Sequence, residues 1–409
     1  MQILYWLAVQ LYHLAVGLLA PFHRRARVFS RERIGAIQRI EDALDGRKPG
    51  PLVWVHIASV GELEQAKPII ERLKATERPP QVLLTFFSPS GFKAGQTYRF
   101  ADFVHYLPKD TPTNARRLVR AVAPSTVVFV KYDLWYFLLK ELHRQELPVY
   151  VVCAHFRPSQ MYFGITRRFW LQVLKPIKHY FVQSEEVAML LRLHGIHQVI
   201  VAGDTRFDRV AAVVNSARSW PKIQRFRGEE PLMVLGSIWP SDMEVWEPII
   251  RKHVSTVKWL IAPHLVDYTD QLLSLPHSVR YTDSALGDQH RILILDTMGM
   301  LSSVYGLGAV AYVGGAFRGA LHNVLEPAAH GMPVLVGAHK KNSKFLEVAA
   351  LQERGGLRRF THTEDLEQVF LQLMENKRKR MEMAEASAKF IEEHVGASNL
   401  IVKELIKWI

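Results

Sequence analysis

Residues 309–337, AVAYVGGAFRGALHNVLEPAAHGMPVLVG, constrain the fold of this chain more than any other stretch. An apolar run ends at Gly314-Gly315, a segment with helical spacing follows from His322 to Ala329, and a second apolar run begins at Pro333. A strand, a glycine turn, a helix and a strand in such close succession predict one βαβ unit of a parallel sheet.

The same stretch predicts a ligand site. Paired glycines allow a ligand to approach the backbone, and the start of a helix offers free N–H groups and a positive dipole end to an anion. His322 and Glu326 are four residues apart, so we expect both on one side of the helix, close to Asn323. The simplest occupant is a nucleotide, and the alternative is a tight turn between two buried elements.

From Leu52 onwards, apolar runs of strand length alternate with helical patterns such as 62–74 and 114–123, which predicts α/β domains with parallel sheets covered on both faces. The expected strands form two series: 52–58, 82–87, 126–130, 149–154 and 199–203, then 232–237, 257–262, 291–296, 309–314 and 333–337. Two doubly wound sheets should direct their strand carboxyl ends towards a shared cleft, where such sheets bind ligands.

The polar segment 208–230 separates the two series, and we interpret it as a linker. It divides the chain into a first domain, 31–207, and a second domain, 231–385, followed by a charged helical segment, 386–409. A chain of 409 residues is long enough for two domains that each bury a core.

Residues 1–30 begin with an apolar, uncharged stretch whose length is close to that of a membrane span, followed by Arg24, Arg25 and Arg27. The stretch lacks the basic start and the cleavage site of a secretory signal, so we expect it to be retained. Basic residues on its carboxyl side would keep the rest of the chain in the cytoplasm. We expect an anchor that spans or lies in the membrane, and the alternative is a buried first helix.

The formal net charge of +13 predicts anionic partners: nucleic acid, anionic lipid or phosphorylated substrates. No Arg-rich run interleaved with aromatic residues marks a nucleic-acid surface, so we expect no nucleic acid partner. The one cysteine, Cys153, excludes an intramolecular disulfide, and its apolar neighbours favour a core residue over a nucleophile.

The loop after the first expected strand carries the candidate catalytic group. In Ser59-Val60-Gly61-Glu62 the glycine should supply a tight turn and place Glu62 at a helix start, where a carboxylate can act as general base for a hydroxyl. Alternatively, Glu62 completes a capping box with Ser59. The residues alone do not decide between these two interpretations.

Two later loops of the first series add candidate binding residues. Ser88 and Ser90 lie in a hydroxyl-rich turn that can hold a phosphate or a sugar, although ordinary turn chemistry also produces such a sequence. Lys131 and Asp133 belong to a basic, acidic and aromatic cluster after the strand at 126–130.

The loops of the second series carry further candidates. Gly236-Ser237 opens a loop that ends in Asp242 and that we interpret as a possible anion nest. The next two strands lead to Pro263-His264 and to Thr297 and Gly299. Neither a HExxH motif, a Walker-type loop nor a paired-cysteine spacing is present, so we expect no metal.

Taken together, these motifs resemble those of the 3-deoxy-D-manno-octulosonic acid (Kdo) transferases, the glycosyltransferases of lipopolysaccharide assembly. The matching pieces are HIASVGELEQAKPII, TFFSPSG, DLW, GDTRFD, GSIWPSD, APH, LDTMG and the stretch 309–337. The resemblance implies a GT-B architecture, with an acceptor-binding and a donor-binding Rossmann-like domain. It also implies CMP-Kdo as donor, a phosphorylated lipid A precursor (lipid IVA) as acceptor, inversion at the transferred carbon, no cofactor, and a place at the anionic cytoplasmic leaflet of the inner membrane.

The resemblance also assigns roles. Glu62 takes the place of the catalytic base. The donor contacts that it implies, together with those from the loops, are Gly236, Ser237, Pro263, His264, Thr297, Gly299, Gly314, Gly315, His322, Asn323 and Glu326. The acceptor contacts expected from the first series are Ser59, Gly61, Ser88, Ser90, Lys131 and Asp133.

The chain departs from the family pattern at three places that bear on the donor. Pro263-His264 stands where Pro-Arg-His is frequent, Met300 stands where a glutamate is common, and Ala320-Leu321 precedes His322-Asn323 where two glycines are usual. A basic donor contact is then either missing or supplied elsewhere. Lys340, Lys341 and Lys344 lie near the donor helix, and the alternative for each is plain solvated surface.

Two alternative functions remain open from the sequence. The first is a GT-B glycosyltransferase that uses a UDP- or GDP-sugar. The second is a basic protein without catalytic activity that binds a membrane surface or nucleic acid, which accounts for the charge but not for the glycines and Glu62 at strand ends.

Overall fold

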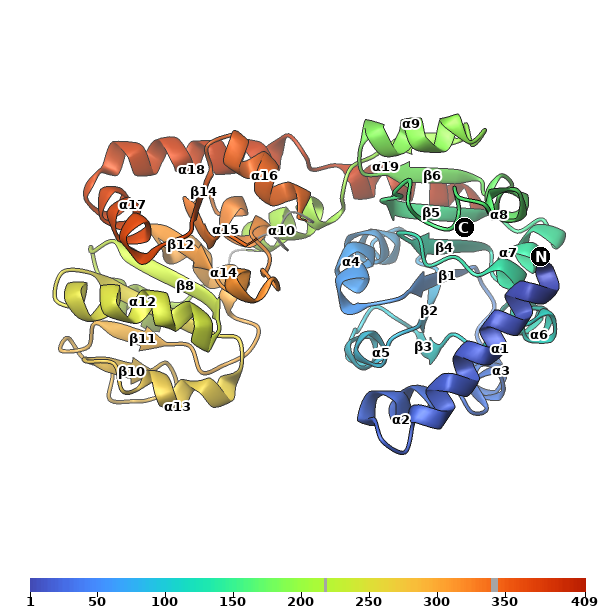
Figure 1. Ribbon diagram of the computed structural model, residues 1–409, viewed down its shortest axis with the longest axis horizontal. Coiled ribbons are helices and arrows are strands. Elements are labelled where there is room, and N and C mark those ends of the chain that lie inside the picture. The colour runs from blue at the N-terminus through green and yellow to red at the C-terminus, as the bar shows by residue number, and fades with distance from the viewer. Residues whose placement is uncertain (217–218, 340–344) are drawn as a thin grey trace. The chain divides into compact units, whose positions relative to one another are not determined.

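The computed structural model describes residues 1–216, 219–339 and 345–409, and it divides into two compact units (Figure 1). Unit 1 consists of Met1–Arg209 and Gly396–Ile409, and unit 2 consists of Val210–Val395. Each unit has a seven-stranded parallel sheet with helices on both faces, which confirms the expected fold class. Lys340, Lys341 and Lys344 lie outside the described residues.

Unit 1 contains the first seven strands: β1 (Leu52–Ile57), β2 (Gln81–Phe86), β3 (Phe103–Tyr106), β4 (Thr126–Val130), β5 (Val149–Ala154), β6 (His179–Val182) and β7 (Val199–Val201). Its helices are α1 (Gln2–Leu19), α2 (Arg24–Arg31), α3 (Ala36–Leu44), α4 (Val60–Lys74), α5 (Pro89–Gln96), α6 (Pro112–Val122), α7 (Tyr136–Arg144), α8 (Arg167–Leu174), α9 (Glu185–Leu193), α19 (Ala397–Leu405) and the 3-10 turn η5 (Ile406–Trp408). The helix α10 (Arg206–Asn215) begins in unit 1 and continues into unit 2.

The strand order in unit 1 is β3-β2-β1-β4-β5-β6-β7, so β1 pairs with both β2 and β4. Trp54 of β1 packs into a core on one face of the sheet, whereas Val53 and Val55 pack into the core on the other face. Because side chains alternate along a strand, a strand that is apolar at every position must be covered twice. This explains why β1 reads as a continuous apolar run.

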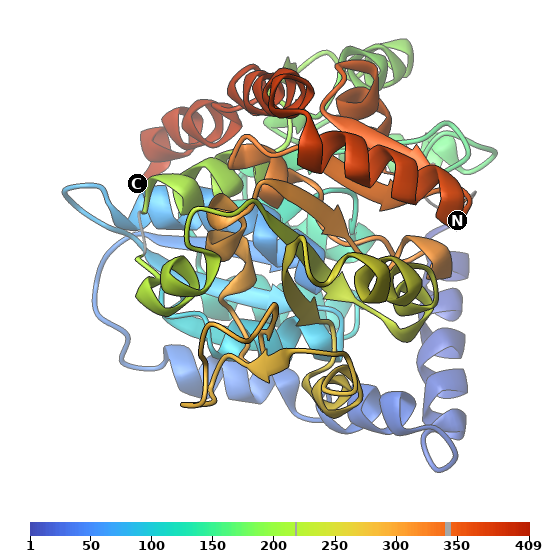
Figure 2. The ribbon, with the colours of Figure 1, turned by 90° about the vertical axis from the view of Figure 1, so that its left-hand side faces the viewer.

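Unit 2 repeats this architecture with β8 (Leu232–Ile238), β9 (Lys258–Pro263), β10 (Ser278–Arg280), β11 (Ile292–Ile294), β12 (Val310–Val313), β13 (Val334–Gly337) and β14 (Leu357–Phe360). The strand order is β10-β11-β9-β8-β12-β13-β14. Figure 2, in which this unit faces the viewer, shows the yellow to orange strands with helices on either side. The helices and 3-10 turns are α11 (Pro221–Arg227), α12 (Pro240–His253), η1 (Val266–Tyr268), α13 (Thr269–Leu272), α14 (Leu301–Val304), η2 (Tyr305–Leu307), η3 (Ala316–Arg318), α15 (Leu325–Ala329), α16 (Leu346–Glu353), α17 (Thr363–Glu375) and α18 (Lys377–Glu392).

The units do not end where the sequence suggested. The segment 208–230, expected as a linker, contains most of α10 and all of α11, and the first boundary falls after Arg209. The expected boundary at 385 lies inside α18, while α19 belongs to unit 1. Polar composition alone does not distinguish an exposed helix from a linker, because both are solvated.

The helix α1 lies along the outside of unit 1 in both views (Figures 1 and 2). The Tyr5 hydroxyl donates to Asp110 Oδ2 at 2.8 Å, and its ring packs against aromatic side chains of α7 and α8. The helix is long and apolar enough to cross a membrane, and only 6% of it is buried inside the protein. The alternative of a buried first helix is therefore wrong.

The GDTRFD motif holds the chain end to unit 1. Asp204 accepts hydrogen bonds from Gln65 of α4 and from Gln183. Asp208 Oδ1 accepts the N–H of Gly396 at 2.9 Å, and its Oδ2 accepts the N–H of Ser398 at 3.1 Å. Asp208 therefore caps the first turn of α19, whose backbone donors would otherwise lack a partner.

We predict that Asp208→Ala loosens α19. Loss of a helix cap costs about 1 kcal/mol, so α19 amides should exchange hydrogen about 5-fold faster. Hydrogen exchange with mass spectrometry measures this rate, and Asp365→Ala on α17 should leave α19 unchanged. Equal exchange in the wild type and Asp208→Ala would contradict the capping role.

Candidate functional site

The candidate residues of unit 1 lie where the winding of its sheet reverses. The chain proceeds from β1 to β2 on one side, and the later strand β4 pairs with β1 on the other side. The loops after β1 and β4 therefore diverge at the strand carboxyl ends, which is where open α/β sheets bind ligands. The first loop leads to Glu62, and the second carries Lys131 and Asp133.

Glu62 lies in the first turn of α4 and is only 7% exposed. Its Oε2 accepts the N–H of Ala58 at 2.6 Å. Within the described residues, its second carboxylate oxygen has no hydrogen bond. Ser59 is the residue before the helix, but its side chain makes no cap hydrogen bond. The capping-box interpretation is therefore wrong, and one carboxylate oxygen stays available.

Burial raises the pKa of Glu62 above its usual value. The N–H of Ala58 and the Lys131 ammonium oppose this rise, whereas the charge of Asp133 adds to it. The two charged residues after β4 thus act on the pKa of Glu62 in opposite directions, and burial remains the largest effect. A carboxylate with a raised pKa is a stronger base than an exposed one and is suited to removing a proton from a hydroxyl.

The tight turn expected at Gly61 is absent. Gly61 is exposed, lies inside the first turn of α4, and has no positive φ. A Cβ at this position would meet no described atom within 4 Å, so packing does not require glycine. The missing side chain leaves open space next to Glu62.

The two serines after β2 differ in role. The Ser88 hydroxyl accepts the N–H of Gly91 at 3.1 Å and caps α5, a role that was not expected from the sequence. Ser90 is exposed. The first turn of α5 lies beside Ser59, because a Cβ on Gly91 would be 3.4 Å from the Ser59 carbonyl carbon. Ser90 is therefore the serine of this pair that is free of a capping role.

Sequence reasoning missed His56, a fully buried histidine of β1. Its Nε2 lies 2.9 Å from Asp133 Oδ2, and its Nδ1 lies 3.0 Å from the Thr85 hydroxyl. The indole N–H of Trp135 also donates to Asp133, at 3.3 Å. These bonds hold Asp133 in place beside Glu62. The available signal was a polar residue within the otherwise apolar run LVWVHIA.

In unit 2 the winding reverses between β8 and β12, the two strands that lead to Ser237 and to Gly314-Gly315. A Cβ on Gly314 would lie 2.4 Å from the Ser237 carbonyl oxygen, and one on Gly315 would lie 2.4 Å from the Ala320 carbonyl oxygen. Gly315 also has a φ of 87°. The glycine pair is therefore required for the two loops to approach each other.

Asp242 organises this region and does not leave a nest open for an anion. It is fully buried in the first turn of α12. Its Oδ2 accepts the N–H groups of Trp239 at 2.9 Å and Gly315 at 3.0 Å, and its Oδ1 accepts the Tyr312 hydroxyl at 2.6 Å. The carboxylate occupies the donors that an external anion would use, so the anion-nest interpretation of this loop is wrong.

The helix expected from His322 is shorter than the spacing suggested. It is α15, which begins at Leu325, so His322 and Glu326 do not share a helix face. Pro327 lacks an N–H and is tolerated only in the first turn, which excludes a helix start at His322. Asn323 bridges the two parts: its Oδ1 accepts the N–H of Leu325, and its Nδ2 donates to Glu326 at 3.2 Å.

His322 instead belongs to a group of stacked rings. The ring of His264 lies 4.2 Å from that of Trp239 and 4.5 Å from that of His322. The Trp239 indole N–H donates to His322 Nε2 at 3.1 Å. Burial and the neighbouring His264 lower the pKa of His322 to about 4, so it is neutral and accepts this bond. Trp239 was not among the expected site residues, although it follows Ser237 closely.

Arg318 is a second residue that sequence reasoning missed. Its guanidinium lies 4.7 Å from the centre of the Trp239 ring, at the exposed side of the group. In the described ranges of the chain it forms no ion pair with a carboxylate. It therefore supplies positive charge near Gly315, and this charge also acts on Asp242.

The remaining donor candidates lie at the same edge of the sheet. Gly236 is in β8, where a Cβ would collide with the Tyr305 hydroxyl, and Pro263 ends β9. Thr297 and Gly299 follow β11, and the Thr297 hydroxyl contacts the sulfur of Met300 at 2.6 Å. No contact described in the structure joins Thr297 or Gly299 to the ring group. In the part of the chain that the structure describes, no cluster of His, Cys, Asp or Glu could hold a metal ion.

Comparison with known proteins identifies the relatives of this chain. Residues 30–209 match the family described as 3-deoxy-D-manno-octulosonic-acid transferase (kdotransferase). The transferase of Bordetella pertussis is 27% identical over 397 residues, which cover 89% of this chain and 89% of the relative. That of Chlamydophila psittaci is 26% identical and covers 75% and 74%, respectively.

The chain is therefore similar to Kdo transferases over most of its length. It is accordingly a glycosyltransferase, as the resemblance implied. The solved structures agree with the fold of this family: a UDP-GlcNAc 2-epimerase from Neisseria meningitidis, at 16% identity, covers 87% of this chain and 100% of its own with a TM-score of 0.59. The Acinetobacter baumannii MurG structure, at 13% identity, covers 88% and 100% with a TM-score of 0.55. The expected GT-B architecture is thereby confirmed.

We predict that Glu62→Gln stabilises unit 1 at neutral pH. Burial raises the pKa of Glu62 above that in the unfolded chain, so ionisation costs stability as the pH rises through the folded pKa and costs none below the unfolded pKa. The gain in thermal midpoint should appear at pH 8 and vanish near pH 4, about the pKa of an unperturbed glutamate.

Glu64→Gln is the matched control on the same helix, because Glu64 is half-buried and pairs with Lys67. It should give no gain that grows with pH. A Glu62→Gln effect of equal size at both pH values would show that ionisation of Glu62 does not cost stability. Calorimetric unfolding across this pH range measures the difference.

Proposed function

We propose that this chain transfers Kdo from CMP-Kdo to a phosphorylated lipid A precursor, lipid IVA, with inversion at the transferred carbon. The observation that carries the proposal is Glu62: a buried carboxylate at the switch point of the sheet, with a raised pKa and one unused oxygen. Similarity to Kdo transferases supports Kdo as the sugar, and the donor and acceptor are inferred from it.

In the proposed reaction, the unused oxygen of Glu62 accepts the proton of an acceptor sugar hydroxyl. The hydroxyl oxygen forms a bond to the anomeric carbon of Kdo, while the bond from that carbon to the phosphate oxygen breaks and its electron pair leaves with CMP. One displacement from the opposite side inverts the anomeric carbon. Glu62 then gives its proton to solvent.

Two features of unit 1 support Glu62 as the base. The Ala58 N–H fixes one carboxylate oxygen, so the other oxygen has a defined direction. A Cβ on Gly61 would meet no described atom within 4 Å, so open space lies beside the residue that precedes Glu62. The charges of Lys131 and Asp133, which we expect as acceptor contacts, act on Glu62, and this supports their assignment to the acceptor side.

Unit 2 supplies the proposed donor contacts. CMP leaves with negative charge on its phosphate, and preorganised donors stabilise such developing charge. We assign this role to Arg318, which forms no ion pair with a carboxylate within the described residues, and to His264, which stacks on the same Trp239 ring. Asn323 and Glu326 form a hydrogen-bonded pair that offers polar groups to a sugar or a base.

We predict that Glu62→Gln lowers kcat for Kdo transfer by at least about 10²-fold, within the usual effect of a general base. The dissociation constant for CMP should change little, because Glu62 belongs to unit 1. Glu64→Gln should retain the wild-type rate. Mass spectrometry of the glycolipid product measures transfer, and calorimetric titration measures CMP binding.

Near-normal transfer by Glu62→Gln would remove Glu62 from the mechanism. Protection of the protein from heat by UDP or GDP but not by CMP would instead favour the other donor class. These two outcomes are independent, since one concerns the base and the other concerns the nucleotide.

We further propose that α1 lies in the plane of the anionic cytoplasmic leaflet of the inner membrane and does not span it. Gln2 near one end donates to the Tyr136 hydroxyl at 3.0 Å, and Gln10 accepts a hydrogen bond from Lys109. A helix attached along its length to a folded unit cannot cross a bilayer without drawing that unit inside. Its outward-facing apolar residues are Ile3, Leu4, Leu7, Leu11, Leu14 and Leu18.

Charge near this helix supports the same placement. Arg24 and Arg25 of α2 are exposed, and each basic residue near an anionic surface contributes about 1 kcal/mol to binding. Arg27 has another role, because its guanidinium donates to the carbonyl oxygens of Ala20 and Pro21 at the end of α1.

We predict that replacing Leu4, Leu11 and Leu18 together by Gln weakens binding to anionic vesicles by at least about 10-fold, because apolar area no longer enters the acyl region. The matched control replaces Ile165, Met189 and Leu193, which are exposed elsewhere on unit 1. Vesicle sedimentation measures the partition. Equal loss in both triple variants would contradict a specific role of α1.

A further inference from the structure

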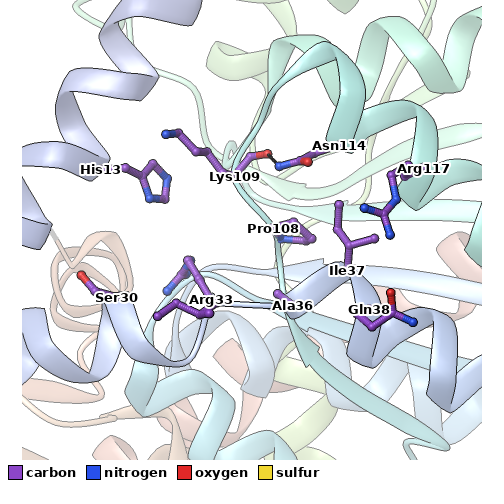
Figure 3. Close-up of a pocket in the computed structure, with 12 residues that line it drawn as sticks. His13, Ser30, Arg33, Ala36, Ile37, Gln38, Pro108, Lys109, Asn114 and Arg117 are labelled. Atoms are coloured by element: carbon purple, nitrogen blue, oxygen red, sulfur yellow. Dashed lines mark hydrogen bonds between the residues drawn. The ribbon is translucent and has the colours of Figure 1, made fainter.

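A cavity of about 410 Å³ opens in unit 1 between α1, the turn from α2 to α3, and α6 (Figure 3). Its volume lies within the range of pockets that enclose small molecules. None of the expected site residues lines it. The lining residues come from three parts of the unit: His13 of α1, Ser30 and residues 33–38 around the start of α3, and Pro108, Lys109, Asn114 and Arg117 before and in α6.

Three cationic side chains line the cavity and no carboxylate does. Figure 3 shows Arg33 and Lys109 on the side of His13, with Arg117 farther along α6. Arg117 pairs with Glu41 at 2.7 Å. Within the described residues, neither Arg33 nor Lys109 has an ion-pair partner. The cavity therefore carries uncompensated positive charge.

The fold holds these cations in place by neutral groups. Arg33 donates to the carbonyl oxygens of Phe29 and Phe87, and its guanidinium lies 3.6 Å from the centre of the Phe29 ring. Lys109 donates to the Gln10 side chain. Desolvating a cation without a counter-charge is unfavourable, so such a cluster is best satisfied by an anion from outside.

The positive charge around the cavity affects the pKa of His13. Burial, followed by the charges of Lys109 and Arg33, lowers its pKa to about 4. Burial also lowers the pKa of Arg33 to about 10. An anion in the cavity would oppose both effects.

We propose that this cavity binds a phosphate group of the glycolipid acceptor through Lys109 and Arg117, with Arg33 behind them. The proposal rests on the proposed function, because it takes the phosphorylated lipid A precursor as the acceptor. The paired N–H donors of guanidinium and the ammonium of lysine are the groups that bind phosphate in proteins. A phosphate held here orients the sugar that carries it.

The position of Arg33 favours the acceptor over a bulk phospholipid. Arg33 donates to the carbonyl oxygen of Phe87, directly after β2, and the Phe87 ring lies 5.2 Å from that of Trp135. Trp135 in turn donates to Asp133, whose charge acts on Glu62. The cavity is thus connected through these contacts to the residues around the proposed base. Attachment to a membrane alone would not require this connection.

The wall of the cavity that α1 forms indicates an amphiphilic ligand. His13 belongs to α1, and the neighbouring residues Leu11 and Leu14 are exposed and apolar. A phosphate in the cavity would have the polar cluster around Glu62 on one side and the apolar surface of α1 on the other. A phosphorylated sugar with acyl chains has this succession of groups.

The test compares the KM for the phosphorylated acceptor with the KM for the same acceptor after removal of its phosphates, in neutral detergent. In the wild type, removal should raise KM at least tenfold. In the double variant Lys109→Met with Arg117→Met, the ratio of the two values should fall to near one. The change should appear in KM rather than kcat, because neither side chain contacts Glu62.

The matched control is Lys140→Met with Arg120→Met. Lys140 donates to Gln2 of α1 as Lys109 donates to Gln10, and Arg120 lies on α6 one turn after Arg117. The control should keep the wild-type ratio. Thermal midpoints verify that both double variants fold, and the single variants Lys109→Met and Arg117→Gln serve if the double variant does not.

Three outcomes would overturn the proposal. A wild-type KM that does not depend on the acceptor phosphates removes the site, and so does a tenfold ratio retained in the double variant. An unchanged ratio combined with lost binding to phosphatidylglycerol vesicles assigns the cavity to bulk lipid. Calorimetry of acceptor binding without donor separates this proposal from the proposed function. If the double variant loses binding of the phosphorylated acceptor selectively, and the wild type transfers no Kdo, the site is kept and the proposed function is rejected.

Discussion

The structure depends on one constraint of parallel sheets: the first strand of each unit hydrogen-bonds on both sides, and the chain winds in opposite directions from it. β1 pairs with β2 and β4, and β8 pairs with β9 and β12. The loops after these strands diverge, so backbone and polar side chains are exposed there without disrupting the core. Each candidate site lies at such a point.

At these points, the number of hydrogen bonds that a buried carboxylate accepts decides whether it has a structural role or is available to a substrate. Asp242 accepts three, from Trp239, Gly315 and Tyr312, and holds the loops of unit 2 together. Glu62 accepts one, from Ala58. Both groups have a raised pKa through burial, yet only Glu62 keeps an oxygen for a substrate. The two residues look equivalent in sequence, since each is an acid in the first turn of a helix after a strand.

Periodicity predicted the long strands well, because a strand buried on both faces is apolar at every position. It missed β3, β6, β10 and β14, which are three or four residues long and include charged or histidine residues. Three of them are edge strands, where burial is incomplete. The four-residue spacing of His322 and Glu326 also predicted a helix that is too long. This spacing does not take into account that Pro327 is tolerated only in the first turn of a helix.

The sequence by itself determined the two α/β units, the glycine pair and the position of Glu62 after β1, because strand burial, backbone freedom and loop order are local or periodic properties. Only the tertiary structure decided that Ser88 is a cap, that His56 fixes Asp133, and that Trp239 stacks on His264. It alone brought Arg33, Lys109 and Arg117 to one cavity beside α1. These relations join residues far apart in the chain, and packing in three dimensions, which local patterns do not encode, sets the distances between them.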